Sequence, residues 1–183
     1  MRKGKPEGVA RYTTIALASA LAWCAGEGVI CAEGHAVARI GPSGEFVELE
    51  HSSDGRIVKN YLPLHHSGNI RYFSAGVGLE ERQAEYPAFS LKLVFTAGGK
   101  PYLTGVEVAI QPRKGDSAVS ISKEHIEAPW LFVDLPAGVY DIIAVYGTEK
   151  RSATGVTIVP GKQKTLYLRW SEDAGAAVHA PAE

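Results

Sequence analysis

The sequence predicts an all-β fold, and three observations indicate it. Short runs rich in Val, Ile, Tyr, Phe and Thr recur along the chain, and these residues favour strands. The 183 residues include 20 glycines and 10 prolines, which supply turns between the runs. Strand patterns do not alternate with long amphipathic helices, and this excludes a parallel α/β sheet.

The composition is that of one globular domain with a core of ordinary size. Hydrophobic residues make up 45% of the chain and charged residues 21%, which is typical of a folded protein. The formal net charge of -1 provides no basic footprint, so we expect no nucleic-acid partner.

Residues 1–32 are predicted to be a secretory signal peptide. Basic residues at positions 2, 3, 5 and 11 precede an uncharged run over 12–26, which matches a positive n-region and an apolar h-region. The run is too short and too rich in alanine for a membrane span. Cleavage fits after Ala22 or after Ala32. The mature protein is therefore expected to be periplasmic or secreted, without a stable membrane span.

The fate of the two cysteines depends on the cleavage site. Cys24 and Cys31 are the only cysteines, and cleavage after Ala32 removes both of them. The mature chain then has no disulfide and no thiol chemistry. The earlier cleavage keeps both cysteines, which could pair across a short loop. Neither fits a lipoprotein signal, which needs a small residue before its cysteine.

Residues 33–68 are expected to be irregular apart from one possible hairpin. Residues 45–51 alternate polar and apolar side chains, as a half-exposed strand does. A turn over 52–55 leads to a returning strand, which Pro63 limits to a sheet edge.

Residues 69–170 are predicted to be a β-sandwich domain with one short helix. A strand over 70–75 and a break at Gly76 and Gly78 precede a helix over 79–86 that ends before Pro87. Further strands are expected at 89–95, 105–110, 118–122, 129–135, 139–147, 153–159 and 164–170. In the expected strand 89–95, alternation places on one face Phe89, Leu91, Leu93 and Phe95. In the expected strand 105–110, it places on one face Val106, Val108 and Ile110. Residues 171–183 are expected to be a disordered tail.

The densest ionisable group, Glu80, Glu81 and Glu85, indicates a solvated helix face. Glu81 and Glu85 stand at i and i+4, so they repel each other on one side of a helix. A glycosidase instead needs two carboxylates that face each other across a cleft. The sequence has no nucleophile elbow and no phosphate-binding loop. We therefore expect no catalytic residue, no cofactor and no enzymatic activity.

The histidines offer a metal-site alternative. His65 and His66 are adjacent and point opposite ways on an extended segment, whereas strand ligands stand at i and i+2. A metal-dependent hydrolase would need His51, Asp54 and one of this pair to meet in a cleft. We expect that no metal is bound. Three further histidines are interpreted as surface residues: His35, His125 and His179.

Aromatic residues define the candidate ligand-binding site. Tyr102, Trp130 and Trp170 lie in the strand region, and aromatic rings on a β-sandwich can stack on sugars. Such rings more often pack in the core or across strands, and the start of the 129–135 strand favours packing for Trp130. If two of the three share an exposed face, they form a carbohydrate-binding platform.

Residues 129–170 resemble a known family. Residues 135–140 have the pattern L-P-x-G-x-Y, and G-V-T-I-V-P-G at 155–161 and L-x-L-R-W at 166–170 follow. This pattern resembles the carboxypeptidase regulatory-like domain, a transthyretin-like (prealbumin-like) seven-stranded β-sandwich. Pro136 and Gly138 would make the turn, and Tyr140 would point into the sandwich. Residues 70–96 resemble small secreted proteins of Gram-negative bacteria that carry this sandwich.

The resemblance covers roughly 69–170 and implies a noncatalytic domain. Some domains of this kind bind carbohydrate, and no active-site residue carries over to this chain. The expected function is a noncatalytic secreted binding or assembly module of the cell envelope, whose partner is an unknown envelope protein or a glycan. The alternative is a carbohydrate-binding module that uses the exposed aromatics.

Overall fold

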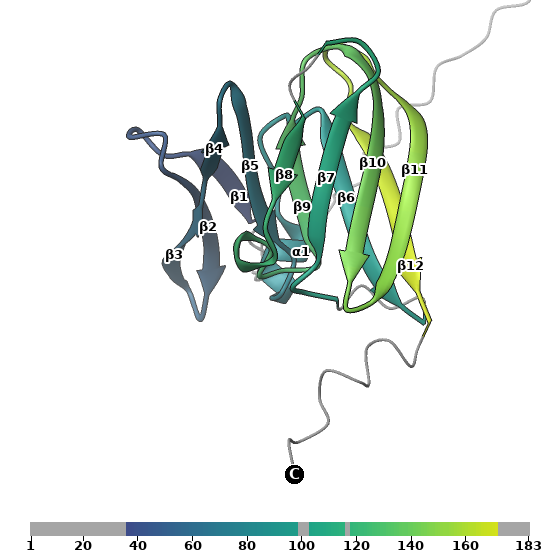
Figure 1. The fold of residues 1–183 in the computed structure, drawn as a ribbon. Helices are drawn as coiled ribbons and strands as arrows, with labels where there is room; N and C mark the ends of the chain where they lie inside the picture. The colour runs from purple at the N-terminus through teal and green to yellow at the C-terminus, as the bar shows by residue number, and fades with distance from the viewer. Residues whose placement is uncertain (1–35, 99–102, 116–117, 172–183) are drawn as a thin grey trace, which may run out of the picture. The chain divides into compact units, whose positions relative to one another are not determined.

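The structure, a computed structural model, describes residues 36–98, 103–115 and 118–171 (Figure 1). Within these ranges 59% of the residues lie in strands and 6% in helical segments. This confirms the prediction of a mostly β chain with one short α-helix. The predicted signal peptide, Tyr102 and positions 172–183 of the predicted tail lie outside the described residues.

The strands in these ranges form three sheets. The first has the order β1–β2–β3, with β1 (Val37–Ile40), β2 (Phe46–Ser53) and β3 (Arg56–Pro63). The second has the order β11–β10–β7–β8, with β7 (Glu107–Pro112), β8 (Val119–Ile121), β10 (Gly138–Tyr146) and β11 (Glu149–Ile158). The third has the order β12–β6–β9–β5–β4, with β4 (His65–Ser67), β5 (Ile70–Ala75), β6 (Leu91–Ala97), β9 (Trp130–Asp134) and β12 (Lys164–Trp170). Strands β12 and β6 pair in parallel, and the other pairings are antiparallel.

The second and third sheets share the larger core, and we call them the sheet pair. Side chains of β9 and β10, such as Leu131 and Ile142, are fully buried between them. The predicted alternation is confirmed for the residues that enter this core, which are Leu91, Leu93, Phe95, Val106, Val108 and Ile110. The predicted number of seven strands is not confirmed, because the two sheets have four and five strands in the described ranges.

A second core lies on the outer face of the five-stranded sheet. Phe73 of β5 and Phe132 of β9 stack with ring centroids 4.7 Å apart and 3° between their planes. Val47 and Leu49 of β2 belong to the same cluster and are fully buried. Phe89 also packs here, 5.0 Å from Phe73, and not with the larger core as predicted. Strand β6 begins only at Leu91, so its alternation does not extend back to Phe89.

The expectation that residues 33–68 are mostly irregular is wrong. The segment holds β1 to β4, and β1 is fixed on both sides. It pairs with β2 on one side, and on the other Ala38 N–H donates to Glu85 O at 2.8 Å while Glu85 N–H donates to Ala36 O at 3.0 Å. The partner at Glu85 is remote in sequence, so the segment alone gave no sign of it.

The predicted hairpin is confirmed. Strands β2 and β3 pair from Ser53↔Arg56 outward, around a two-residue turn at Asp54 and Gly55. Both turn residues have positive φ, 50° and 72°, which a type I′ turn requires and which matches the twist of the strands. Strand β3 lies at the edge of its sheet, as Pro63 indicated.

Helix α1 (Leu79–Gln83) is shorter than predicted. It ends at Gln83 because Ala84 is extended and Glu85 pairs with β1, so Pro87 is not what stops it. A 3₁₀ turn, η1 (Lys123–His125), is the other helical segment in the described ranges. Neither segment is long and apolar enough to cross a membrane.

We expect the second core to contribute strongly to stability. Replacing Phe73 by Ala removes a fully buried ring from the stack, and buried Phe→Ala changes cost about 3–5 kcal/mol. Urea unfolding should show a loss of this size for Phe73→Ala and less than about 1 kcal/mol for the exposed Val139→Ala. A small loss for Phe73→Ala would contradict the packing of β1 and β2 against the five-stranded sheet.

Candidate functional site

Trp170 is not available as a stacking platform, which corrects the prediction. Only 3% of the residue is exposed, because alternation along β12 turns Leu168 and Trp170 into the larger core. Its ring packs edge-on against Phe95 and Tyr146. The indole N–H donates to Glu149 O at 3.3 Å, so the polar edge of the ring is also used internally.

Trp130 is half-buried, and its ring is in close contact with Lys92 and with the backbone at Gly76. Lys92 of the neighbouring strand β6 places its Nζ 3.3 Å from the ring centroid. From the side of β5, Gly76 lies so close that a Cβ there would be 2.8 Å from the ring. Burial lowers the pKa of Lys92 to about 8. Tyr102 lies outside the described residues, and the two predicted aromatics that are described do not share an exposed face, because Trp170 is buried.

The glutamate cluster organises the turn before α1. The Glu81 carboxylate accepts hydrogen bonds from Gly76 N–H at 2.6 Å and Val77 N–H at 3.1 Å. Arg82 donates from its Nε to Gly76 O at 2.7 Å. Glu81 is thus a capping residue that binds backbone, rather than only part of a solvated face as predicted. Glu85 contributes through its backbone pairing with β1.

The histidines do not converge on a metal site. Among the described residues no group of three or more His, Cys, Asp or Glu side chains could hold a metal ion. His51 is buried on β2, and its Nδ1 has no hydrogen-bond partner within the described ranges. His65 instead stacks on His125, with ring centroids 4.1 Å apart, and His125 Nδ1 lies 2.9 Å from the Tyr72 hydroxyl. The sequence placed His125 on the surface, and nothing in its local pattern signalled this distant contact.

The outer edge of β3 presents unpaired backbone groups. Leu64 N–H donates to Glu45 O at 2.9 Å, just beyond the end of β3. With the β2–β3 register, this bond shows which residue pairs of the two strands are hydrogen-bonded. Even-numbered residues of β3 therefore direct their N–H and C=O groups to β2, and Ile57, Lys59 and Tyr61 direct theirs away from it. Among the described residues β3 is the last strand of its sheet, so within them these groups have no neighbouring strand. We call this row the β3 edge.

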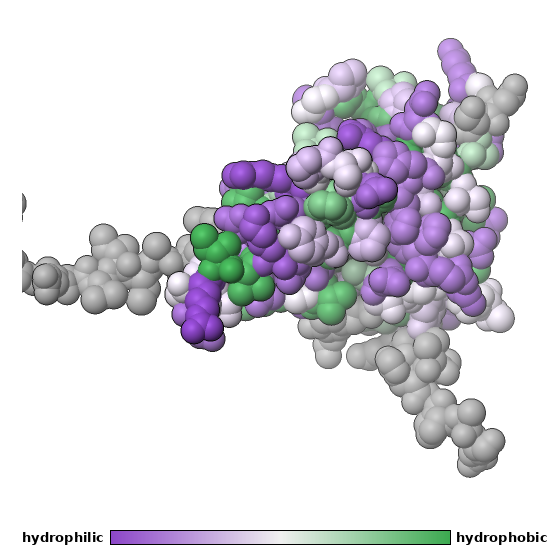
Figure 2. Space-filling model, turned by 90° about the vertical axis from the view of Figure 1, so that its left-hand side faces the viewer, coloured by the Kyte–Doolittle hydropathy of each residue, from purple (hydrophilic) through white to green (hydrophobic). Residues whose placement is uncertain are grey.

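Large apolar side chains are exposed along the β3 edge. Ile57 is 70% exposed and Tyr61 57% exposed, and Val58 on the other face is also exposed. Between them, Lys59 forms ion pairs with Glu48 and Glu50 of β2. Figure 2, which looks onto the left-hand side of Figure 1, shows hydrophobic residues interrupting a hydrophilic surface. The combination of an open backbone and exposed apolar side chains distinguishes this surface.

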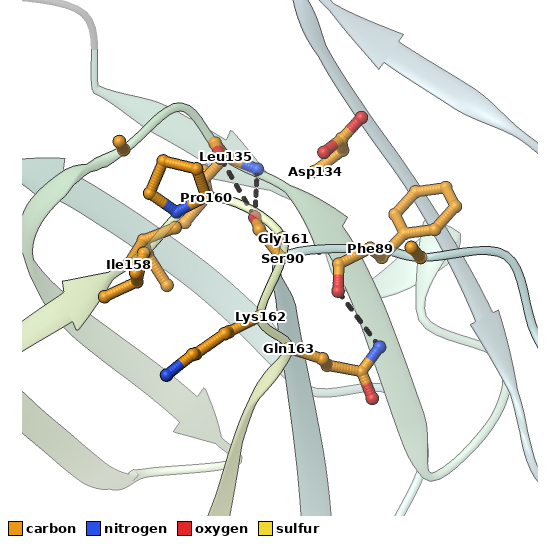
Figure 3. A pocket seen from close by; sticks show the side chains of 12 residues that line it. Phe89, Ser90, Asp134, Leu135, Ile158, Pro160, Gly161, Lys162 and Gln163 are labelled. Atoms are coloured by element: carbon orange, nitrogen blue, oxygen red, sulfur yellow. Dashed lines mark hydrogen bonds between the residues drawn. The ribbon is translucent and has the colours of Figure 1, made fainter.

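Two hollows lie beside the turn between β9 and β10. The first, the β11–β12 hollow, has a volume of about 280 Å³ and is lined by Ser90, Leu135, Lys162 and Gln163 among others. Figure 3 shows hydrogen bonds between the residues that line it. Ser90 Oγ donates to Leu135 O and accepts from Leu135 N–H, and Gln163 Nε2 donates to Phe89 O. Lys162 extends away from Asp134, which is paired with Arg71.

The second, the β7–β8 hollow, is larger, at about 740 Å³. It opens between the β4–β5 turn, the start of β8 and the Leu135–Ala137 turn, and Lys114 stands on its rim. The neighbouring Arg113 is committed to Asp141, with Nε 3.0 Å from Oδ1. The bonds from Arg113, and secondly from Gly155 N–H, hold the pKa of Asp141 below its usual value.

Comparisons with protein-family models, curated proteins and solved structures find no match to this chain. The β3 edge and the two hollows are features that sequence reasoning missed. For the β3 edge a signal existed, since Pro63 and the exposed pattern I-V-K-N-Y in a predicted edge strand point to an unprotected edge. The hollows depend on how loops distant in sequence come together, and no local pattern marks them.

The capping role of Glu81 predicts a stability difference between neighbouring glutamates. Glu81→Ala leaves two backbone N–H groups without their acceptor and should lower the free energy of unfolding by about 1–2 kcal/mol. Glu80→Ala on the exposed side of α1 should cost less than about 0.5 kcal/mol. Equal losses in urea unfolding would show that Glu81 has no special role.

The stacked histidines predict acid sensitivity. Burial, and after it the nearby His125, lower the pKa of His65 from 6.5, while Glu127 opposes and His66 adds to the shift. The folded state therefore favours neutral His65, so this stabilisation is present above about pH 6.5 and is lost as the pH falls through the lowered pKa. Melting temperatures measured between about pH 7.5 and pH 5 should fall less for His65→Gln than for the wild type.

His66→Gln is the matched control for that series. His66 is adjacent and exposed, and it makes no ring contact with His125. Its substitution should change the pH dependence of the melting temperature much less than His65→Gln does, because His66 is the smallest contribution to the lowered pKa of His65. If both variants flatten the profile equally, the stack with His125 is not the cause.

Proposed function

We propose that this protein is a noncatalytic secreted binding or assembly module of the cell envelope, and that its protein partner adds a strand to the β3 edge. The observation that carries the proposal is the eight-residue strand β3, which is exposed except at Leu62 and has no neighbour on its outer side in the described part of the chain. Exposed sheet edges are the templates on which extended segments of other proteins form backbone hydrogen bonds.

The side chains of β3 fit an edge that binds a partner better than an edge that is protected against pairing. Natural edge strands are commonly blunted by a charged residue, a proline or a bulge. Here the one lysine of β3, Lys59, forms ion pairs with Glu48 and Glu50. Arg56 and Pro63 stand at the two ends of the strand. Ile57 and Tyr61 on one face and Val58 on the other would give an incoming strand apolar contacts on both faces.

The family resemblance fits this role. The Leu135–Tyr140 turn has the features that the carboxypeptidase regulatory-like pattern implies, because the Tyr140 ring enters the larger core and its hydroxyl donates to Pro136 O at 2.9 Å. On this proposal the sheet pair is a prealbumin-like sandwich, and β1 to β3 form an added layer that supplies the binding edge. The resemblance implies a domain that is generally noncatalytic, which agrees with a binding or assembly role.

Secretion belongs to the same proposal. A signal peptide over residues 1–32 would deliver the chain to the periplasm or beyond. Cell fractionation and N-terminal sequencing of the exported protein test this directly. A mature protein that begins at or near residue 33 is expected, and a cytoplasmic chain that starts at Met1 would contradict it.

The test of the β3 edge is site-specific cross-linking in cells. A photo-reactive amino acid at Ile57 should form a defined adduct with one envelope protein, and the same group at Val159, an exposed position on another loop, should not. Lys59→Pro should abolish the adduct, because Lys59 N–H points away from β2 and proline there blocks strand addition while leaving the hairpin paired.

Lys59→Ala is the matched control, since it removes the same ion pairs but keeps the backbone donor. It should retain the adduct. An adduct that survives Lys59→Pro would place the partner elsewhere on the protein. A glycan-array signal without any protein adduct would overturn the assembly proposal in favour of carbohydrate binding.

A further inference from the structure

The β7–β8 hollow combines an apolar floor with the ammonium group of Lys114 on its rim. Side chains from both sheets of the pair form the floor: Ile70, Ile110, Val119, Leu135 and Tyr140. Lys114 stands on the rim and is exposed. Its side chain makes no ion pair or hydrogen bond in the described part of the chain.

The size and lining of the hollow suit a small amphipathic molecule. Its volume of about 740 Å³ lies within the usual range of small-ligand sites, roughly 300–1,000 Å³. A polar molecule would find no partners on the aliphatic floor and would lose hydration there. An adjoining hollow of about 510 Å³ shares Pro112, Lys114, Ala137 and Tyr140, so Lys114 stands between two apolar surfaces.

The positive charge of Lys114 at the rim favours an anionic ligand. A single charge with nearby hydrogen-bond donors suits a carboxylate better than a phosphate. The neighbouring Arg113 is paired with Asp141, and among the described residues that line the hollow Lys114 is the one with a charge. A phosphate group carries up to two charges and is commonly held by arginine forks. A carboxylate carries one charge, and Ser67 and Asn69 on the same rim offer donors for its second oxygen.

We propose that the β7–β8 hollow binds a small carboxylic acid with an alkyl or aryl tail. The tail lies on the floor formed by Ile110, Val119 and Tyr140, and the carboxylate pairs with Lys114. The site is formed by other residues than the β3 edge, so it stands or falls independently of partner binding there.

Decanoate is the probe, with decyltrimethylammonium as a cation of the same tail. Calorimetry on the protein purified from cells that express the full chain should show decanoate binding at least tenfold tighter than the cation. Lys114→Ala should weaken decanoate binding by about tenfold, because one charge-assisted contact is lost. Lys162→Ala, which removes the free lysine of the β11–β12 hollow, should leave it unchanged.

A filling variant separates the hollow from nonspecific adsorption. Ala118 lines the hollow and is exposed at its rim, so Ala118→Trp should fill the site without entering the core. It should abolish decanoate binding while the melting temperature stays within a few degrees of the wild type. The proposal is overturned if decanoate does not bind, if both probes bind equally, or if Lys114→Ala or Ala118→Trp leaves the affinity unchanged.

Discussion

The stack of Phe73 on Phe132 is the contact on which the arrangement of the layers depends. The two residues stand opposite each other on β5 and β9, and both rings lie on the outer face of the five-stranded sheet. An outer face with large aromatic side chains must be covered, because exposing it to water would cost several kcal/mol. Strands β1 and β2 provide that cover. Strand β9 is thereby buried on both faces, with Leu131 and Val133 in the larger core and Phe132 in the smaller one.

The exposure of β3 follows from the same packing. Val47 and Leu49 of β2 and Ala38 of β1 lie against the aromatic group. On β3 Leu62 also packs against it, and the other residues of the strand are exposed. The sheet is therefore anchored by two strands, and the third extends past the core with its outer backbone groups open. A stable platform that carries an open strand is what recognition by strand addition requires, since the edge is held in an extended conformation before the partner arrives.

Regular alternation made much of the β structure predictable, and contacts distant in sequence made the rest unpredictable. Leu91, Leu93 and Phe95 alternate with less apolar residues, and they lie in the core as predicted. The run W-L-F-V-D of β9 has no alternation because both of its faces are buried, so the sequence could not assign a side to Trp130. Strand β1 has four residues and depends on Glu85, and His65 meets His125 across sixty residues of chain. The surroundings of Trp130 were unpredictable for the same reason, since Lys92 of β6 and Gly76, which follows β5, both lie against its ring.

Amide hydrogen exchange along β3 tests the central claim most directly, because the claim is that one side of this strand is bonded and the other is open. The account predicts slow exchange at Val58, Asn60 and Leu62, whose N–H groups face β2, and fast exchange at Ile57, Lys59 and Tyr61. Addition of the partner should slow the second group and leave the first unchanged. Equal protection of all six amides in the isolated protein would show that the β3 edge is already covered, and would contradict the account.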